Sequence, residues 1–141
     1  MEGILIPKQQ IAAVERSYQR CILQKSWISD FYGILLKSSK EFPPYFKKTD
    51  FSKQIIILQN AISFLIMHAK GIPLAEMKVG KIGETHRKGE MNIKVHLYPL
   101  WIDSLILSIK KHDKQCDDEI ESAWREVLQV GVDLIISKYN N

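Results

Sequence analysis

The spacing of apolar residues limits this chain to a helical fold. Apolar residues recur at steps of three and four positions along most of the sequence, which is the period of an α-helix. The dipeptides Asn-Gly and Asp-Gly, which favour tight turns between strands, are missing. We therefore expect an all-α protein of six or seven helices, without a linker, a repeat or a low-complexity segment.

Prolines and capping residues divide the first half of the chain into helices. Pro7 suits the first turn of a helix, because its missing N–H has no partner there. A second helix starts near Ser26 and must end before Pro43, since a residue that precedes proline is pushed out of the helical conformation. The short aromatic connector 42–46 then leads to Thr49–Asp50, which is expected to cap a long third helix. This spacing leaves no room for a separate small helix after the connector.

The second half of the chain is divided in the same way. The third helix is expected to end at Lys70–Gly71, where glycine can take the left-handed cap conformation, and Pro73 permits a new start. A weaker helical segment then reaches 86–89. Asn92 is expected to cap the next helix, with Pro99 in its second turn, and Asp117–Asp118 to cap the last one.

Length and composition exclude several classes of protein. With 141 residues the chain has the size of one domain, residues 1–141. Its longest apolar stretch, Ile55–Met67, is interrupted by Gln59 and Asn60 and is too short to span a membrane. The first residues lack the features of a secretion signal. Cys21 and Cys116 lie far apart in the sequence, so we expect neither a cysteine metal site nor a disulfide framework, and we expect a reducing cytoplasm.

The net charge is modest and evenly distributed. Acidic and basic residues alternate along the chain and give a formal charge of +4. Because no basic arm separates from the rest, we do not expect nucleic acid as a partner. The positive excess remains compatible with an anionic ligand, such as a cofactor that carries carboxylates.

Three polar residues stand out in apolar surroundings, namely Tyr32, Gln54 and His86. Each has an ordinary structural explanation when taken alone. A buried tyrosine hydroxyl is usually satisfied by a backbone carbonyl. A glutamine near a helix start is usually exposed, and a histidine near a helix end can simply interact with the helix dipole. His68, His96 and His112 have no stronger individual claim. Periodicity and composition therefore identify no site.

The order and spacing of several motifs resemble those of bacterial globins over nearly the whole chain. Within that superfamily the chain looks most like the single-domain members of the sensor-globin lineage, mainly from His86 onward. The segments that carry the resemblance are Asp30–Leu36, Phe42–Phe46, Asp50–Leu58, Ile82–His86, Met91–Ile93, Leu97–Trp101, Asp103–Leu105 and Ala123–Leu128.

The resemblance implies an all-α globin fold around one haem pocket and gives its residues particular roles. His86 matches the proximal ligand of the iron in haem b (iron protoporphyrin IX), and Phe46 matches the phenylalanine that packs on the porphyrin. Tyr32, Gln54 and Leu58 match the distal residues that surround a bound gas. The Tyr32 hydroxyl and the Gln54 amide are each expected to donate a hydrogen bond to bound O₂, and two donors should give slow release. Further cofactor contacts are expected from Ile82, Ile93 and Tyr98, while His96 belongs to either the pocket or the surface.

Cations near the pocket rim could pair with the haem propionates, and the candidates are Lys47, Lys53, Arg87 and Lys88, although the default for any one of them is a solvated side chain. One feature departs from some relatives. Flavohaemoglobins support the proximal histidine with a carboxylate on the last helix, whereas the matching segment here, 137–139, contains no acid. Without that carboxylate, peroxidase-like or efficient NO-dioxygenase activity is less expected.

The leading hypothesis is therefore a haem protein that reversibly binds O₂, and also NO and CO, in gas sensing or oxygen binding, with no catalytic residue. The alternative is an NO dioxygenase or other haem oxidant that depends on an external reductase. A third is a globin fold without haem that acts as an interaction module. The sequence does not identify the signalling or reductase partner that these roles would require. A homodimer through the last two long helices is possible, with Trp101 and Trp124 either at that interface or in the core.

Overall fold

In the computed structural model, residues 6–141 are described, and they form six α-helices and two short 3₁₀ helices without a strand. The expectation about a secretion signal concerns the first residues, and most of these lie outside the described part. The elements are α1 (Lys8–Ile22), α2 (Trp27–Ser38), η1 (Pro43–Phe46), α3 (Phe51–Ala69), α4 (Pro73–His86), η2 (Val95–Leu97), α5 (Tyr98–His112) and α6 (Asp118–Ser137). The all-α prediction is confirmed, and α3 follows the aromatic connector with no further helix between them.

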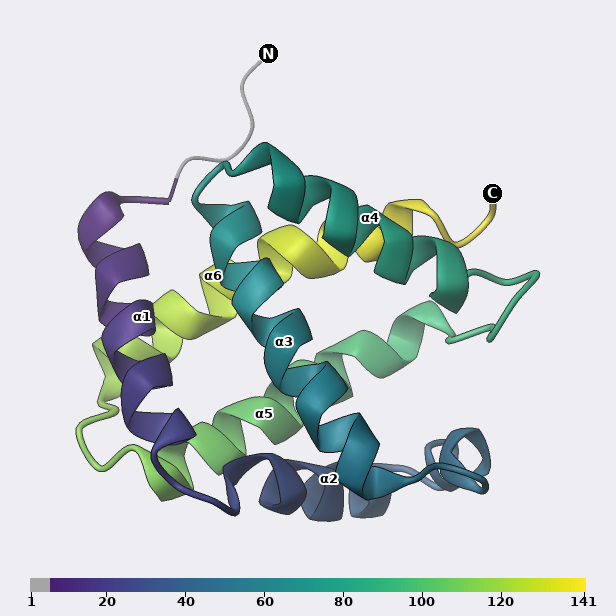
Figure 1. Cartoon of the computed structure of the whole chain (residues 1–141), viewed down its shortest axis with the longest axis horizontal. Coiled ribbons are helices and arrows are strands. Elements are labelled where there is room, and N and C mark those ends of the chain that lie inside the picture. Colours follow the sequence, from purple (N-terminus) through teal and green to yellow (C-terminus); the bar gives the residue numbers. More distant parts are fainter. Residues whose placement is uncertain (1–5) are drawn as a thin grey trace.

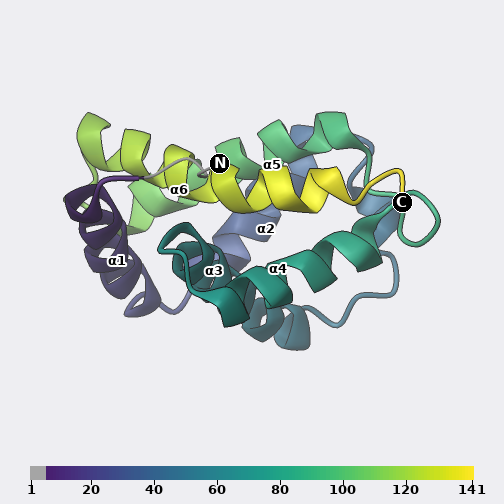
Figure 2. The same ribbon diagram turned by 90° about the horizontal axis from the view of Figure 1, so that it is seen from above.

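The helices form two layers (Figure 1). The view from above shows α5 and α6 side by side in one layer, with α3 and α4 in the other (Figure 2). The helix α2 packs most extensively on α5, whereas α4 packs on both α3 and α6. Since α3 and α4 both pack on α6, apolar side chains from both layers converge between them.

Local signals set the ends of α3 as expected. The Asp50 side chain accepts a hydrogen bond from the Ser52 N–H at 3.0 Å and thereby caps the first turn. At the other end Gly71 has a φ of 86°, a conformation that side-chain-bearing residues rarely adopt. The N–H groups of Gly71 and Ile72 donate to the carbonyls of His68 and Met67, which closes the helix in a Schellman motif.

The predicted start of the fifth helix is wrong. Asn92 does not cap it, because Asn92 lies in a loop with a φ of 54° and the helix α5 begins only at Tyr98. Pro99 consequently falls in the first turn of α5, where its missing N–H removes no helical bond. The preceding helix also ends earlier than expected, at His86, since Arg87 has an extended backbone.

The tryptophans of α5 and α6 both pack against buried residues of this chain. Trp124 is fully buried and donates through its indole N–H to the Ser17 hydroxyl at 2.8 Å. Trp101 packs edge-on against Phe31, with ring centroids 5.8 Å apart. Trp124 therefore belongs to the core, whereas Trp101 contacts the core through Phe31 and is partly exposed.

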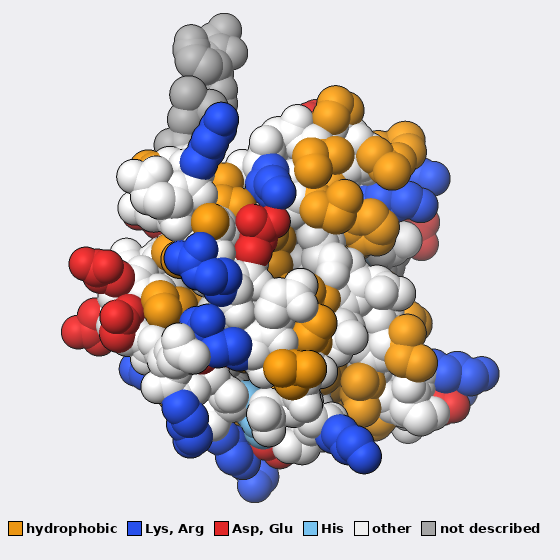
Figure 3. All heavy atoms as spheres, turned by 60° about the vertical axis from the view of Figure 1, so that its left-hand side comes forward, with side chains coloured by type: hydrophobic (Ala, Val, Ile, Leu, Met, Phe, Trp, Pro, Cys, Tyr) orange, Lys and Arg blue, Asp and Glu red, His pale blue; other side chains and the backbone are white. Residues whose placement is uncertain are grey.

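Large exposed hydrophobic residues are concentrated on α3, α4 and the segment after them. On the face drawn in Figure 3, hydrophobic and basic side chains are interspersed, and acidic side chains gather mainly at one edge. None of the described helices combines the length and hydropathy that crossing a membrane requires. The exposed apolar residues of this region are Ile56, Ile57, Leu74, Met77, Met91 and Val95.

Candidate functional site

A cavity of about 570 Å³ lies between the two layers and is lined mainly by apolar side chains. This volume falls within the range that small-molecule sites usually have. All eight residues that the sequence singled out for a cofactor or a gas line this one cavity, although they come from five different elements and a loop. These residues are Tyr32, Phe46, Gln54, Leu58, Ile82, His86, Ile93 and Tyr98.

The helix α3 supplies one long wall of the cavity. Gln54, Leu58, Ala61 and Leu65 follow each other at steps of three or four residues, so they share one face of the helix. Gln54 is the polar member of this row. The cap at Asp50 starts α3 one turn before Gln54 and so fixes which face Gln54 occupies.

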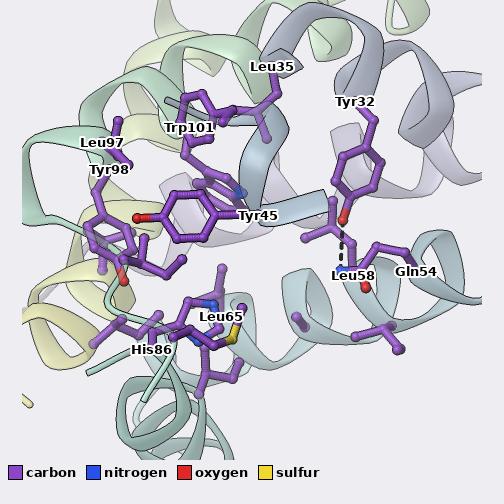
Figure 4. Close-up of a pocket in the computed structure, with 18 of the residues that line it drawn as sticks. Tyr32, Leu35, Tyr45, Gln54, Leu58, Leu65, His86, Leu97, Tyr98 and Trp101 are labelled. Atoms are coloured by element: carbon purple, nitrogen blue, oxygen red, sulfur yellow. Dashed lines mark hydrogen bonds between the residues drawn. The ribbon is translucent and has the colours of Figure 1, made fainter. Parts of the chain in front are cut away.

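Tyr32 and Gln54 form a polar pair at one end of the cavity (Figure 4). The Gln54 side-chain amide donates a hydrogen bond to the Tyr32 hydroxyl oxygen at 3.0 Å. Because the hydroxyl accepts this bond, its own proton remains available for another acceptor. We expected two independent donors from the sequence. The structure instead engages one amide proton of Gln54 with Tyr32, which leaves the tyrosine as the more direct donor toward the cavity.

Aromatic packing and burial fix the state of Tyr32. Its ring makes edge contacts with Phe46 and Phe51, with centroids 5.6 and 5.3 Å away. Burial raises the pKa of Tyr32 to about 12, although the Gln54 hydrogen bond acts in the opposite direction. The hydroxyl therefore stays protonated at neutral pH and acts as a donor.

His86 is the last residue of α4 and lies at the other end of the cavity from the Tyr32 pair (Figure 4). Its Nδ1 atom is 3.0 Å from the Thr85 hydroxyl. That hydroxyl donates its single proton to the Ile82 carbonyl at 2.9 Å, so toward His86 it can only accept. Nδ1 consequently carries the ring proton, and Nε2 of the neutral ring keeps a free electron pair.

The burial of His86 favours the same state. Removal from water lowers the pKa of His86, against a smaller opposing effect of the Ile82 carbonyl. The imidazole is therefore neutral at pH 7, as a nitrogen ligand of a metal must be. No described residue forms a hydrogen bond with Nε2.

The loop after His86 is held by contacts with distant parts of the chain. The Tyr45 hydroxyl donates to the Asn92 carbonyl at 2.7 Å, and the Tyr139 hydroxyl donates to the Asn92 side-chain oxygen at 2.6 Å. The His86 carbonyl itself accepts a bond from the Ile93 N–H at 3.0 Å. Residues of η1 and the C-terminal segment thereby fix the loop that carries Ile93 and leads to Tyr98.

The cations expected at the rim do not line the cavity. Lys47, Lys53, Arg87 and Lys88 are absent from its walls, and Arg87 donates instead to Glu90 and to the Asn141 carbonyl. Lys78, which the sequence did not single out, is the lysine that lines the cavity. None of these four side chains therefore belongs to the cavity wall, and their pairing with haem propionates stays a prediction.

Other lining residues also escaped sequence reasoning. Tyr45, Phe64 and Trp101 contribute aromatic walls, and their pattern in the sequence did not distinguish them from ordinary core residues. His96 does not line the cavity, since its side chain is exposed and pairs with Glu41 at 2.7 Å. Of the two readings left open for His96, the surface one is correct.

The donor set limits the kind of cofactor that fits. Within the described residues, no three His, Cys, Asp or Glu side chains come together as a site for a bare metal ion. A single free imidazole nitrogen in an apolar cavity fits a metal that arrives with its remaining ligands already bound. A flat, apolar metal macrocycle such as haem meets this description.

Comparisons with known proteins agree with the fold. No family model matches the chain, and no curated protein does. Among solved structures, the chain is similar to a protein from Pseudomonas aeruginosa that is described as structurally highly homologous to a human haemoglobin. The two share 33% sequence identity and superimpose with a TM-score of 0.90 over 94% of this chain and 99% of the other. The likeness thus covers nearly the whole chain.

Proposed function

Because this chain belongs to the globin family, we propose that it binds haem b in the cavity between its helical layers and reversibly holds a diatomic gas beside Tyr32. One observation carries the proposal. A neutral imidazole with a free Nε2 electron pair shares an otherwise apolar cavity with the hydrogen-bonded Tyr32–Gln54 pair.

Different cavity residues would hold different parts of the cofactor. Haem would supply an iron atom that takes a nitrogen ligand from the protein and that can bind a diatomic gas. His86 provides the nitrogen, and Thr85 keeps the imidazole in the tautomer that leaves Nε2 free. The apolar walls, with Leu58 and Ile82 on opposite helices, exclude water from the ring of the cofactor.

Tyr32 determines how strongly a polarised gas is held. A hydroxyl proton that is not used by Gln54 can be donated to a gas that gains negative charge, as O₂ does. Such a bond is worth about 1.5 kcal/mol or more, which slows gas release roughly tenfold. CO gains less charge and benefits less.

Binding is favoured over oxidation chemistry by the surroundings of His86. Its Nδ1 proton is accepted by the neutral Thr85 hydroxyl, and no carboxylate lines the cavity. A neutral acceptor makes the imidazole a weaker electron donor than a carboxylate would. We therefore propose gas sensing or oxygen binding, and the sensing role depends on the resemblance to the sensor-globin lineage.

A titration with haem, followed by spectra of the reduced protein with and without gas, tests the proposal. We expect saturation at one haem per chain, a strong Soret band and reversible shifts with O₂ and CO. If haem fails to saturate at this ratio, or if added gas leaves the reduced spectrum unchanged, the proposed function is wrong. Sustained consumption of NO with a reductase and NADH would instead establish the oxidant alternative.

A further inference from the structure

Lys78 lies where the cavity reaches the surface between α3 and α4. Ile57 and Asn60 on α3 and Lys78 on α4 are all exposed, yet all three line the cavity together with His86. Since exposed residues from both helices border the same space, the cavity opens to solvent here. Exposed Met91 borders it at the other end of α4, next to His86.

The charge at this opening is uncompensated. No Asp, Glu or Arg is among the residues that line the cavity, and Lys78 forms no ion pair with any described residue. Its ammonium nitrogen lies 6.0 Å from the centre of the Phe64 ring, another residue of the cavity wall. The aromatic face stabilises an ammonium at this position only weakly. The cavity is thus lined by one lysine, whose ammonium has no acidic partner among the described residues and can bind an anion.

The cations at the opposite end are less suited to this task. Arg87 already binds Glu90 and the Asn141 carbonyl, and the neighbouring Lys88 does not line the cavity. Lys78 precedes His86 by eight residues on α4, with Ile82 between them, so all three lie along one face of the helix. A flat ligand whose centre is held by His86 would therefore extend toward Lys78 along this face.

We propose that Lys78 binds a carboxylate of haem, so that the propionate edge of the cofactor faces the opening between α3 and α4. This inference rests on the proposed function, because it requires haem in the cavity. It assigns the anion-binding role to Lys78 in place of the four cations that the sequence suggested.

The test compares haem with haem dimethyl ester, in which both carboxylates are neutralised. The rate at which each is transferred to an excess of apomyoglobin is measured for the wild type, Lys78→Gln, Lys78→Arg and Lys81→Gln. Lys81 is the matched control, since it is an exposed lysine on the same helix that does not line the cavity. We expect Lys78→Gln to release haem about twofold to fivefold faster, as for a partly exposed charged pair.

The ester separates a charge effect from a packing effect. We expect the ester to leave the wild type and Lys78→Gln at equal rates, Lys78→Arg to retain haem, and Lys81→Gln to match the wild type. Equal haem release from the wild type and Lys78→Gln would overturn the proposal. So would equal acceleration of haem and ester by Lys78→Gln. If the wild type binds no haem at all, the proposed function itself fails, which is a different result from either.

Discussion

The Gln54 amide donates a hydrogen bond to the Tyr32 hydroxyl at 3.0 Å, so Gln54 orients the residue that faces the ligand space. We expect Tyr32→Phe to speed O₂ release about tenfold or more, since it removes a bond to a charged acceptor. CO release should change less. Flash photolysis and stopped-flow mixing measure both rates. Tyr18→Phe is the control, because Tyr18 lies outside the cavity and bonds to Ser63.

Gln54 should act largely through Tyr32. We expect Gln54→Leu to speed O₂ release less than Tyr32→Phe does, and to have little effect when Tyr32 is already phenylalanine. A double-mutant cycle on the same rates measures this coupling. If Gln54→Leu has the same effect with and without the tyrosine hydroxyl, the two residues act independently, as first expected from the sequence.

Gly83 allows α4, which carries His86, to approach α6. A Cβ atom at this position would lie 3.1 Å from the Ile135 Cα atom and 2.8 Å from the Lys138 Cγ atom. We expect Gly83→Ala to destabilise the protein by about 1–3 kcal/mol, because the Ile135 contact is with backbone that cannot easily move. Urea unfolding measures the effect. Gly80→Ala on the same helix meets nothing within 4 Å and should be neutral or stabilising, and an equal loss in both variants would contradict the argument.

Asn92 combines a left-handed backbone with a tertiary hydrogen bond. With a φ of 54°, it suits glycine or asparagine better than alanine, and its side chain accepts a bond from Tyr139. We expect Asn92→Ala to lower the free energy of unfolding by about 1–2 kcal/mol and Asn92→Gly to lower it by less. The reverse order in thermal or urea unfolding would show that the backbone conformation contributes nothing.

Asp113 makes the free energy of unfolding depend on pH. Burial alone would raise the pKa of this carboxyl, but hydrogen bonds from Arg20, Ser17 and the Gln115 N–H outweigh it and lower the pKa. A lowered pKa means that this stabilisation is present above the pKa of an unfolded aspartate, near 4, and is lost as the pH falls through the folded value.

The variant Asp113→Asn tests this dependence. At pH 7 it should lower the free energy of unfolding by about 3 kcal/mol, because it leaves Arg20 without its partner. The difference from the wild type should shrink as the pH falls below about 4 and Asp113 itself becomes protonated. Urea unfolding at several pH values measures it, and a difference that does not change with pH would contradict the assignment.

The features that could be predicted from the sequence are those that local interactions determine. The cap at Asp50 and the glycine stop at Gly71 depend on residues within a few positions, so the ends of α3 were predictable. The start of α5 was not, because Asn92 is held in its loop by Tyr45 and Tyr139, each 47 positions away. The capping preference of asparagine was correct in general but was overridden by these bonds.

The candidate site shows the same division. Tyr32, Gln54 and His86 were ambiguous one by one, and the order of the surrounding motifs brought them together before any geometry was known. The direction of the Tyr32–Gln54 bond could not be predicted, since it joins residues 22 positions apart. Nor could the choice of Lys78 over Lys53 or Arg87, because the distance of a flexible cation from the cavity depends on how whole helices pack.

The most direct test of the central claim, that His86 holds the cofactor through Nε2, is the absorption spectrum of His86→Gly with haem, before and after imidazole is added. We expect the variant to lose stable haem or to show a strongly altered Soret band, and free imidazole to restore the wild-type spectrum by occupying the space of the missing ring. A spectrum and haem stoichiometry that remain those of the wild type without imidazole would show that His86 is not the ligand.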